Sequence, residues 1–187
     1  MNDTERALLI SVHPRFATAI LEGSKTVELR RQRVAVPEGT PLVLYATSPV
    51  MALVGTARVS RVDSATPAAI WRQHRAHSGI NRDEYDAYMQ GASQASALVL
   101  DSPQNLDHSV PLTHLRAGGT FHPPQSYRYI TRTFLLEVLR GHKAEDQLLA
   151  QLDTPQTTES LSVRTLTPRP KSKSSMRSAS LLTAPAQ

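Results

Sequence analysis

A lysine, a glutamate and an arginine lie close together in the pattern Gly23-x-Lys25-x-x-Glu28-x-Arg30. Apolar and charged residues alternate over 27–30, and this period of two predicts a strand with the carboxylate and the guanidinium on one face. The glutamate can orient the cations or accept hydrogen bonds from a base edge, while lysine and arginine suit phosphate or carbonyl oxygens. Taken alone, such charges favour a solvated strand face with surface ion pairs.

Two short elements precede this motif and are expected to position it. Residues 7–12 form an apolar run ended by Pro14, which predicts a buried first strand. Residues 14–21 place apolar side chains at helical spacing and are followed by Gly23, which predicts a short helix. Because this helix precedes the strand, residues 23–26 do not form a phosphate-binding P-loop, which needs the opposite order.

The rest of the chain predicts further short strands with helices between them. Strands are predicted at 42–46, 53–62, 97–100 and 127–130, and helices begin at 66, 81 and 133. Strict alternation of strand and helix is absent, so the sequence predicts an α+β fold with a mixed or antiparallel β-barrel and peripheral helices. The tryptophan, Trp71, lies among apolar residues and is expected to be a core anchor.

The composition of the chain excludes several classes of protein. A chain of 187 residues with 40% hydrophobic residues supports one domain. The absence of cysteine excludes disulfides and thiol nucleophiles, and with neither a long apolar run nor a secretory signal we expect a cytoplasmic protein without a membrane span. His74 and His77 stand at i, i+3 without a third ligand, so an exposed helix face is expected rather than a metal site.

The net charge of +5 is located at the C-terminal end. Residues from 160 onward contain five basic residues and no acidic one, so the preceding part is formally neutral. We predict a disordered basic tail rich in Ser, Thr and Pro over 153–187. Residues 132–152 are expected to form a C-terminal helical extension, and residues 1–6 an N-terminal extension.

Residues 7–131 resemble the ASCH family, the activating signal cointegrator homology domains of the PUA-like superfamily. The Gly-x-Lys-x-x-Glu-x-Arg motif carries the resemblance, supported by segments 44–50, 54–55 and 124–129. The resemblance implies a PUA-like β-barrel with a polar pocket. The ligand-binding residues that it implies are Lys25, Glu28, Arg30, Tyr45, Ser48, Gln125, Ser126 and Tyr127.

The leading hypothesis is a binding module without a cofactor that recognises RNA or a modified nucleotide and acts in transcriptional or translational regulation. The alternative is a small hydrolase, a ribonuclease or an acetylated-cytidine amidohydrolase, in which Lys25 and Glu28 are the catalytic candidates. The amidohydrolases that resemble this chain have a threonine at the position of Glu28 and a glutamate near the position of Ser78, and these two departures weaken the enzyme alternative. Glu84, six residues after Ser78, can take the place of that glutamate if its helix is placed differently. A pocket for a small anion or metabolite is a third possibility.

Overall fold

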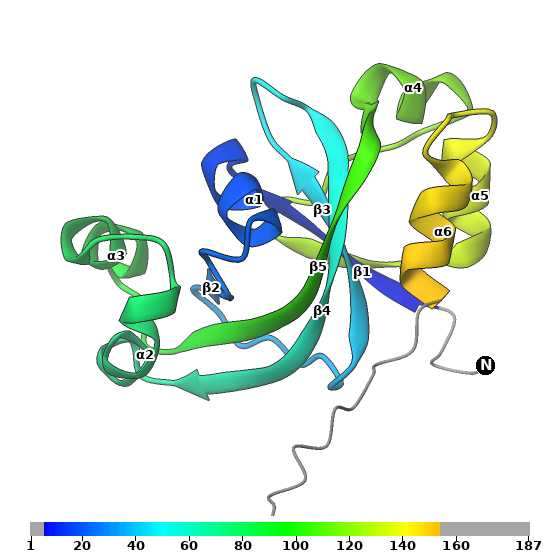
Figure 1. Cartoon of the computed structure of the whole chain (residues 1–187). Coiled ribbons are helices and arrows are strands. Elements are labelled where there is room, and N and C mark those ends of the chain that lie inside the picture. The colour runs from blue at the N-terminus through cyan, green and yellow to red at the C-terminus, as the bar shows by residue number, and fades with distance from the viewer. Residues whose placement is uncertain (1–5, 154–187) are drawn as a thin grey trace, which may run out of the picture. The chain divides into compact units, whose positions relative to one another are not determined.

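The computed structural model describes residues 6–153, which form a mixed sheet with helices around it (Figure 1). The predicted α+β class is confirmed. The strands are β1 (Arg6–Val12), β2 (Val27–Arg30), β3 (Thr40–Ala46), β4 (Ala52–Ala65), β5 (Ala95–Pro111) and β6 (Tyr127–Thr131). The helices are α1 (Pro14–Leu21), α2 (Pro67–His74), α3 (Arg82–Met89), α4 (Leu112–Ala117), α5 (Arg132–Leu139) and α6 (Glu145–Asp153), with a short 3-10 turn, η2 (Arg75–His77), after α2.

The six strands are arranged in the order β2-β5-β4-β3-β1-β6. β1 and β3 run parallel, whereas the other neighbouring strands are antiparallel. The register between the two long strands β4 and β5 shifts at three places, for example between Leu53 and Gly55. Such irregularities bend a strand and increase its twist, so these two strands curve along their length.

The predicted closed barrel is wrong, because the edge strands β2 and β6 do not pair with each other and the sheet is open. These edge strands have four and five residues and pair only with β5 and β1, respectively. Side chains bridge the opening instead. Arg30 of β2 donates to the carbonyl oxygen of Ser11 at 3.3 Å, and the Tyr129 hydroxyl of β6 donates to the carbonyl oxygen of Ala35 at 3.4 Å.

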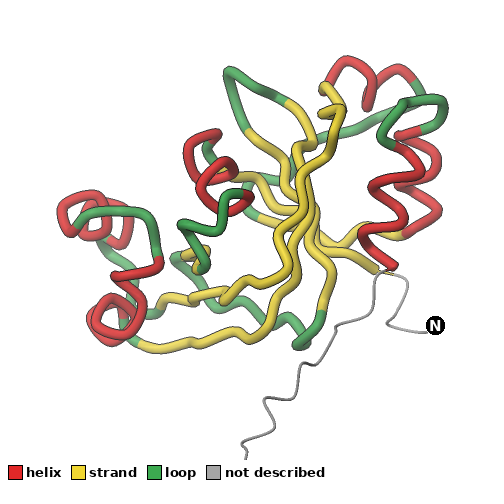
Figure 2. Tube along the Cα trace, viewed as in Figure 1, coloured by secondary structure: helices red, strands yellow, loops and turns green. Residues whose placement is uncertain are grey.

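Three apolar clusters attach the helices to the sheet. Figures 1 and 2 show α5 and α6 on one side of the sheet and α1 on the other. Leu9 and Val43 pack on the side covered by α4, α5 and α6, whereas Leu8 and Ile10 pack with α1 on the other side. This division follows from the alternation of side chains along a strand. A third cluster joins β2 and the start of β5 to α2 and α3. Trp71, expected to be a core anchor, packs against this cluster and is only partly buried.

The predicted extension over 132–152 contains α5 and α6. The predicted tail lies outside the described residues except for Asp153, which ends α6. Within residues 6–153, none of the helices has the length and apolar character needed to cross a bilayer.

Candidate functional site

Lys25, Glu28 and Arg30 form a buried chain of ion pairs. Their exposed fractions are 2%, 5% and 8%. The lysine Nζ lies 3.2 Å from one carboxylate oxygen of Glu28, and Nη1 of Arg30 lies 3.2 Å from the other. The interpretation of these charges as a solvated strand face is therefore wrong, because all three groups are buried and paired with one another.

The apolar residues of β2 explain why this strand holds charged groups in the interior. Val27 and Leu29 pack into the cluster that contains Ile70 and Tyr85, which fixes one face of the strand against α2 and α3. Glu28 lies on the opposite face, as the period of two predicts. Burial of the apolar face thus positions the carboxylate.

Lys25 acts as an anchor for the surrounding backbone. Besides contacting Glu28, its Nζ donates to the carbonyl oxygens of Val27 at 2.6 Å and Ser78 at 2.5 Å. These three contacts use the three protons of an ammonium group. Burial lowers the pKa of Lys25, and the charge of Glu28 opposes that shift. Lys25 therefore holds Glu28 and the segment after η2 together, and its expected part in ligand binding or catalysis stays a prediction.

Arg30 has hydrogen-bonding capacity that the described residues do not use. Nη1 pairs with Glu28 and Nη2 donates to the Ser11 carbonyl oxygen, but Nε is buried without a hydrogen-bond partner. An unpaired buried donor costs about 1–3 kcal/mol. A ligand that brings an acceptor to this position would remove that cost.

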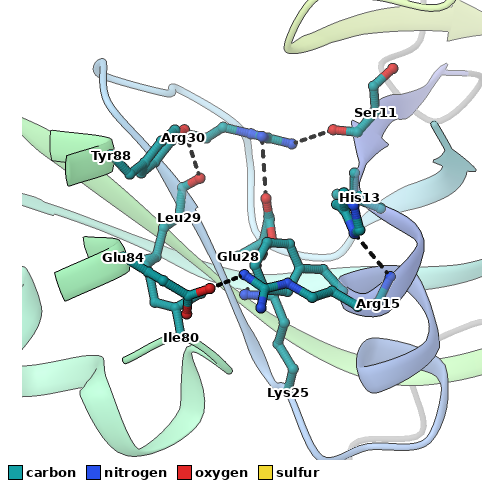
Figure 3. A pocket seen from close by; sticks show the side chains of 12 residues that line it. Ser11, His13, Arg15, Lys25, Glu28, Leu29, Arg30, Ile80, Glu84 and Tyr88 are labelled. Atoms are coloured by element: carbon teal, nitrogen blue, oxygen red, sulfur yellow. Dashed lines mark hydrogen bonds and ion pairs between the residues drawn. The ribbon is translucent and has the colours of Figure 1, made fainter. Parts of the chain in front are cut away.

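These groups face a pocket of about 330 Å³ between β2, α1 and α3 (Figure 3). Its volume is at the lower end of the range for small-molecule sites. Its walls combine buried charges with aromatic and apolar side chains. The lining residues are Ser11, Val12, His13, Arg15, Phe16, Lys25, Glu28, Leu29, Arg30, Ile80, Glu84 and Tyr88.

An ion pair joins the two helices that border the pocket. Arg15 of α1 reaches to Glu84 of α3, as Figure 3 shows, and the side chains are 54% and 35% exposed. The hydrogen bond from Arg15 lowers the pKa of Glu84, and the backbone of Asn81 lowers it further. Glu84 thus reaches the pocket, as the amidohydrolase alternative requires, but Arg15 occupies one of its oxygens.

The other predicted site residues lie outside the lining of this pocket. Tyr45 belongs to the cluster on the α4–α6 side of the sheet, where its ring contacts Phe121. Burial raises the pKa of Tyr45, and the charge of Arg116 lowers it in part. Ser48 is exposed between β3 and β4, and Gln125 is exposed before β6.

Ser11 connects the pocket to these remaining residues. Its carbonyl oxygen accepts from Arg30, its amide donates to the carbonyl oxygen of Ser126 at 3.2 Å, and it is the register partner of Tyr45. Tyr127 lies beside it, opposite Ile10, and packs on the α1 side. The predicted set is therefore divided between the pocket and the neighbouring strands, and its role in ligand binding stays a prediction.

Sequence reasoning missed several residues of the pocket. His13, Phe16 and Tyr88 line it, and the one available signal was that His13 precedes Pro14, in the position of a helix cap. His13 Nδ1 accepts from the Arg15 amide, as a capping group does. The family resemblance drew attention to Glu84 of α3, but no pattern in the sequence alone places this helix beside the pocket.

The two histidines, His74 at the end of α2 and His77 in η2, differ in part from the expected exposed face. His74 is 3% exposed and its Nε2 lies 3.0 Å from a carboxylate oxygen of Asp63, whereas His77 is exposed. His74 is buried because its contact with Asp63 joins the end of α2 to β4. Within residues 6–153, no cluster of three or more histidine and carboxylate side chains is arranged to hold a metal ion.

The fold and the pocket define a small α+β domain with an open mixed sheet, and comparison with known proteins assigns it to a family. A family model described as a domain of unknown function (DUF365) matches residues 6–121. The chain is 32% identical over 130 residues to the ASCH domain-containing ribonuclease of Zymomonas mobilis. The matched region covers 66% of this chain and 84% of that protein. The chain belongs to the ASCH domain family.

A solved structure and a second relative extend the comparison. The crystal structure of ASCH from Zymomonas mobilis matches with a TM-score of 0.66 at 28% identity, covering 73% of this chain and 95% of that chain. The chain is also 28% identical over 97 residues to the large ribosomal subunit protein uL22 of Ureaplasma parvum, but it spans only 31% of that protein.

Proposed function

We propose that this chain binds RNA and takes one nucleotide of a single-stranded segment into the pocket between β2, α1 and α3. The observation that carries the proposal is the buried pair of Glu28 and Arg30, which offers a fixed acceptor beside an unpaired donor. The similarity to a protein named as a ribonuclease supports RNA as the ligand class. The expected regulatory role in transcription or translation stays a prediction.

The pocket suits a base that has left its stack. The carboxylate of Glu28 accepts from a ring or exocyclic N–H group, and Arg30 donates to a carbonyl oxygen or ring nitrogen. Phe16 and Tyr88 line the same pocket from α1 and α3, and aromatic rings bind the faces of bases without a strong sequence preference. A single-stranded RNA can supply such a base more easily than a duplex can.

Fluorescence anisotropy with labelled single-stranded and duplex RNA tests the proposal. The informative variant is Tyr88→Ala, because this ring is 39% exposed and its loss leaves the core intact. We expect it to lose about 1–3 kcal/mol of binding free energy, the usual contribution of one stacked base. Tyr129→Ala is the matched control, since that ring is 40% exposed and does not line the pocket. Equal affinities for wild type and Tyr88→Ala would contradict the proposal.

A second candidate function is RNA hydrolysis, which the name of the Zymomonas mobilis relative favours. Cleavage next to a 2′-hydroxyl needs a base that takes its proton and an acid that protonates the departing 5′ oxygen. In the pocket, the carboxylate of Glu28 suits the base, and the exposed imidazole of His13 suits the acid. Lys25, the other expected catalytic residue, has its three protons engaged and positions Glu28 instead.

Product formation separates the two candidates. The labelled RNA and acetylated cytidine are incubated with wild type and with His13→Asn, because asparagine also caps helices and keeps α1 intact. Cleavage of RNA by the wild type that is lost in His13→Asn would make the protein a ribonuclease. Retention of RNA without product would support a binding module. Tyr45→Phe and Ser126→Ala test in the same assay whether these two of the residues implied by the family resemblance contribute.

A further inference from the structure

The ion pair between Arg15 and Glu84 lies beside a pocket whose other described cations are already engaged. Lys25 and Arg30 both contact Glu28 in the interior. Arg15, in contrast, lies half exposed on α1 and pairs with a carboxylate that is itself about one-third exposed. Ion pairs between exposed side chains contribute little to stability, so a stronger anion displaces such a partner easily.

We propose that Arg15 is the phosphate-binding residue of this pocket and that Glu84 occupies its guanidinium until a phosphate takes its place. The ligand class is therefore a phosphorylated nucleotide rather than a nucleoside, an inference that rests on the proposed function. An arginine guanidinium matches two phosphate oxygens at once, and the phosphate of a nucleoside monophosphate carries more charge than a carboxylate. The Arg15 guanidinium lies 4.5 Å from the centre of the Phe16 ring, which orients the group without using its protons.

Glu84 is held in place by its own helix. One of its oxygens accepts from the backbone amide of Asn81 at 3.1 Å, and the Asn81 side chain accepts from the Glu84 amide at 2.9 Å. This reciprocal arrangement is a capping box, which keeps the carboxylate at the start of α3. The Glu84 carboxylate therefore stays near the pocket when Arg15 turns to a phosphate. There the carboxylate competes with the phosphate for the Arg15 guanidinium.

The two members of the pair are thus expected to affect binding in opposite directions. Arg15→Met removes the phosphate contact. Glu84→Gln removes the competing charge and preserves the cap, because glutamine serves in a capping box as well. Asp86→Asn is the matched control, since this exposed carboxylate lies on the same helix and pairs with Arg82 at 2.6 Å.

Isothermal titration calorimetry provides the test, with the full chain and each of the four ribonucleosides, their 3′- and 5′-monophosphates and inorganic phosphate. We expect the wild type to bind one monophosphate about ten- to a hundredfold more tightly than its nucleoside, the usual effect of a charged hydrogen bond. Arg15→Met is expected to abolish this preference, Glu84→Gln to increase monophosphate affinity about two- to fivefold, and Asp86→Asn to change nothing. The salt dependence of RNA binding should also fall by about one unit of slope in Arg15→Met.

Each other outcome overturns the inference in a distinguishable way. Equal affinities for nucleoside and monophosphate, or a preference that survives in Arg15→Met, would refute the phosphate role and leave the proposed function intact if Tyr88→Ala still weakens RNA binding. Lower monophosphate affinity in Glu84→Gln would make Glu84 a direct ligand contact and refute displacement. A wild type that binds neither RNA nor any nucleotide would refute both proposals.

Discussion

Neutralising Glu28 tests whether the buried chain of charges holds the pocket together. Its carboxylate lies between two buried cations, with 3.2 Å to Lys25 Nζ and 3.2 Å to Arg30 Nη1. The variant Glu28→Gln keeps the shape of the side chain and an acceptor oxygen but removes the negative charge. Two cations then remain in the interior without a counter-charge.

The magnitude of the effect follows from burial. Removing one partner of a buried ion pair costs about 3–5 kcal/mol, because the remaining charge stays desolvated and uncompensated. We expect a loss of stability within this range for Glu28→Gln, since all three charged groups are at most 8% exposed. The loss is a large share of a domain's stability of about 5–15 kcal/mol, so Glu28→Gln should fold in buffer but unfold at much lower urea concentration.

Urea unfolding followed by circular dichroism measures this change as a free energy of unfolding. Glu38→Gln is the control, because Glu38 is exposed and its neutralisation should change stability by no more than about 0.5 kcal/mol. A loss below about 1 kcal/mol in Glu28→Gln would refute the argument, since it would show that solvent reaches these charges.

Two further predictions concern stability. Because burial lowers the pKa of Lys25 below its ordinary 10.5, the unfolded chain holds this proton at pH values where the folded chain has released it. The difference in free energy of unfolding between the wild type and Lys25→Met should therefore change in favour of the wild type as the pH approaches 10.5. A difference that does not change with pH would contradict the lowered pKa of Lys25. Gly55→Ala should destabilise by about 1–3 kcal/mol in urea unfolding, because a Cβ there would lie 2.4 Å from the Gln104 carbonyl oxygen. Gly118→Ala is the control, with 3.4 Å to its nearest neighbour, and equal losses in both variants would contradict the clash.

The N-terminal elements were predictable because their signals are local. The apolar run before Pro14 gave β1, and the helical spacing that follows gave the observed bounds of α1. β5 was predicted only over 97–100, before a segment that contains Pro103 and several polar residues. The strand continues to Pro111, since shifts in register against β4 accommodate these residues. The closed barrel was not excluded by any local pattern, because closure depends on whether the edge strands meet.

The candidate site was predictable in part for the same reason. Lys25, Glu28 and Arg30 belong to one turn and one strand, so their spacing in the sequence resembles their spacing in the fold. Their burial was not visible, because the covering helices come from distant segments. The contact between Arg15 and Glu84 joins residues 69 positions apart, and no single-sequence pattern reports such a pair. Physical reasoning on the sequence thus found the interior of the pocket and missed its border.

Ultraviolet cross-linking of the full chain to single-stranded RNA, followed by mass mapping of the modified peptides, tests the central claim most directly. A base that enters the pocket lies within reach of Phe16 on α1 and Tyr88 on α3. Cross-links in the peptides that contain these two residues, weakened by Tyr88→Ala and unaffected by Tyr129→Ala, are the predicted result. Cross-links confined to other peptides, with none on α1 or α3, would contradict the claim that this pocket holds the RNA.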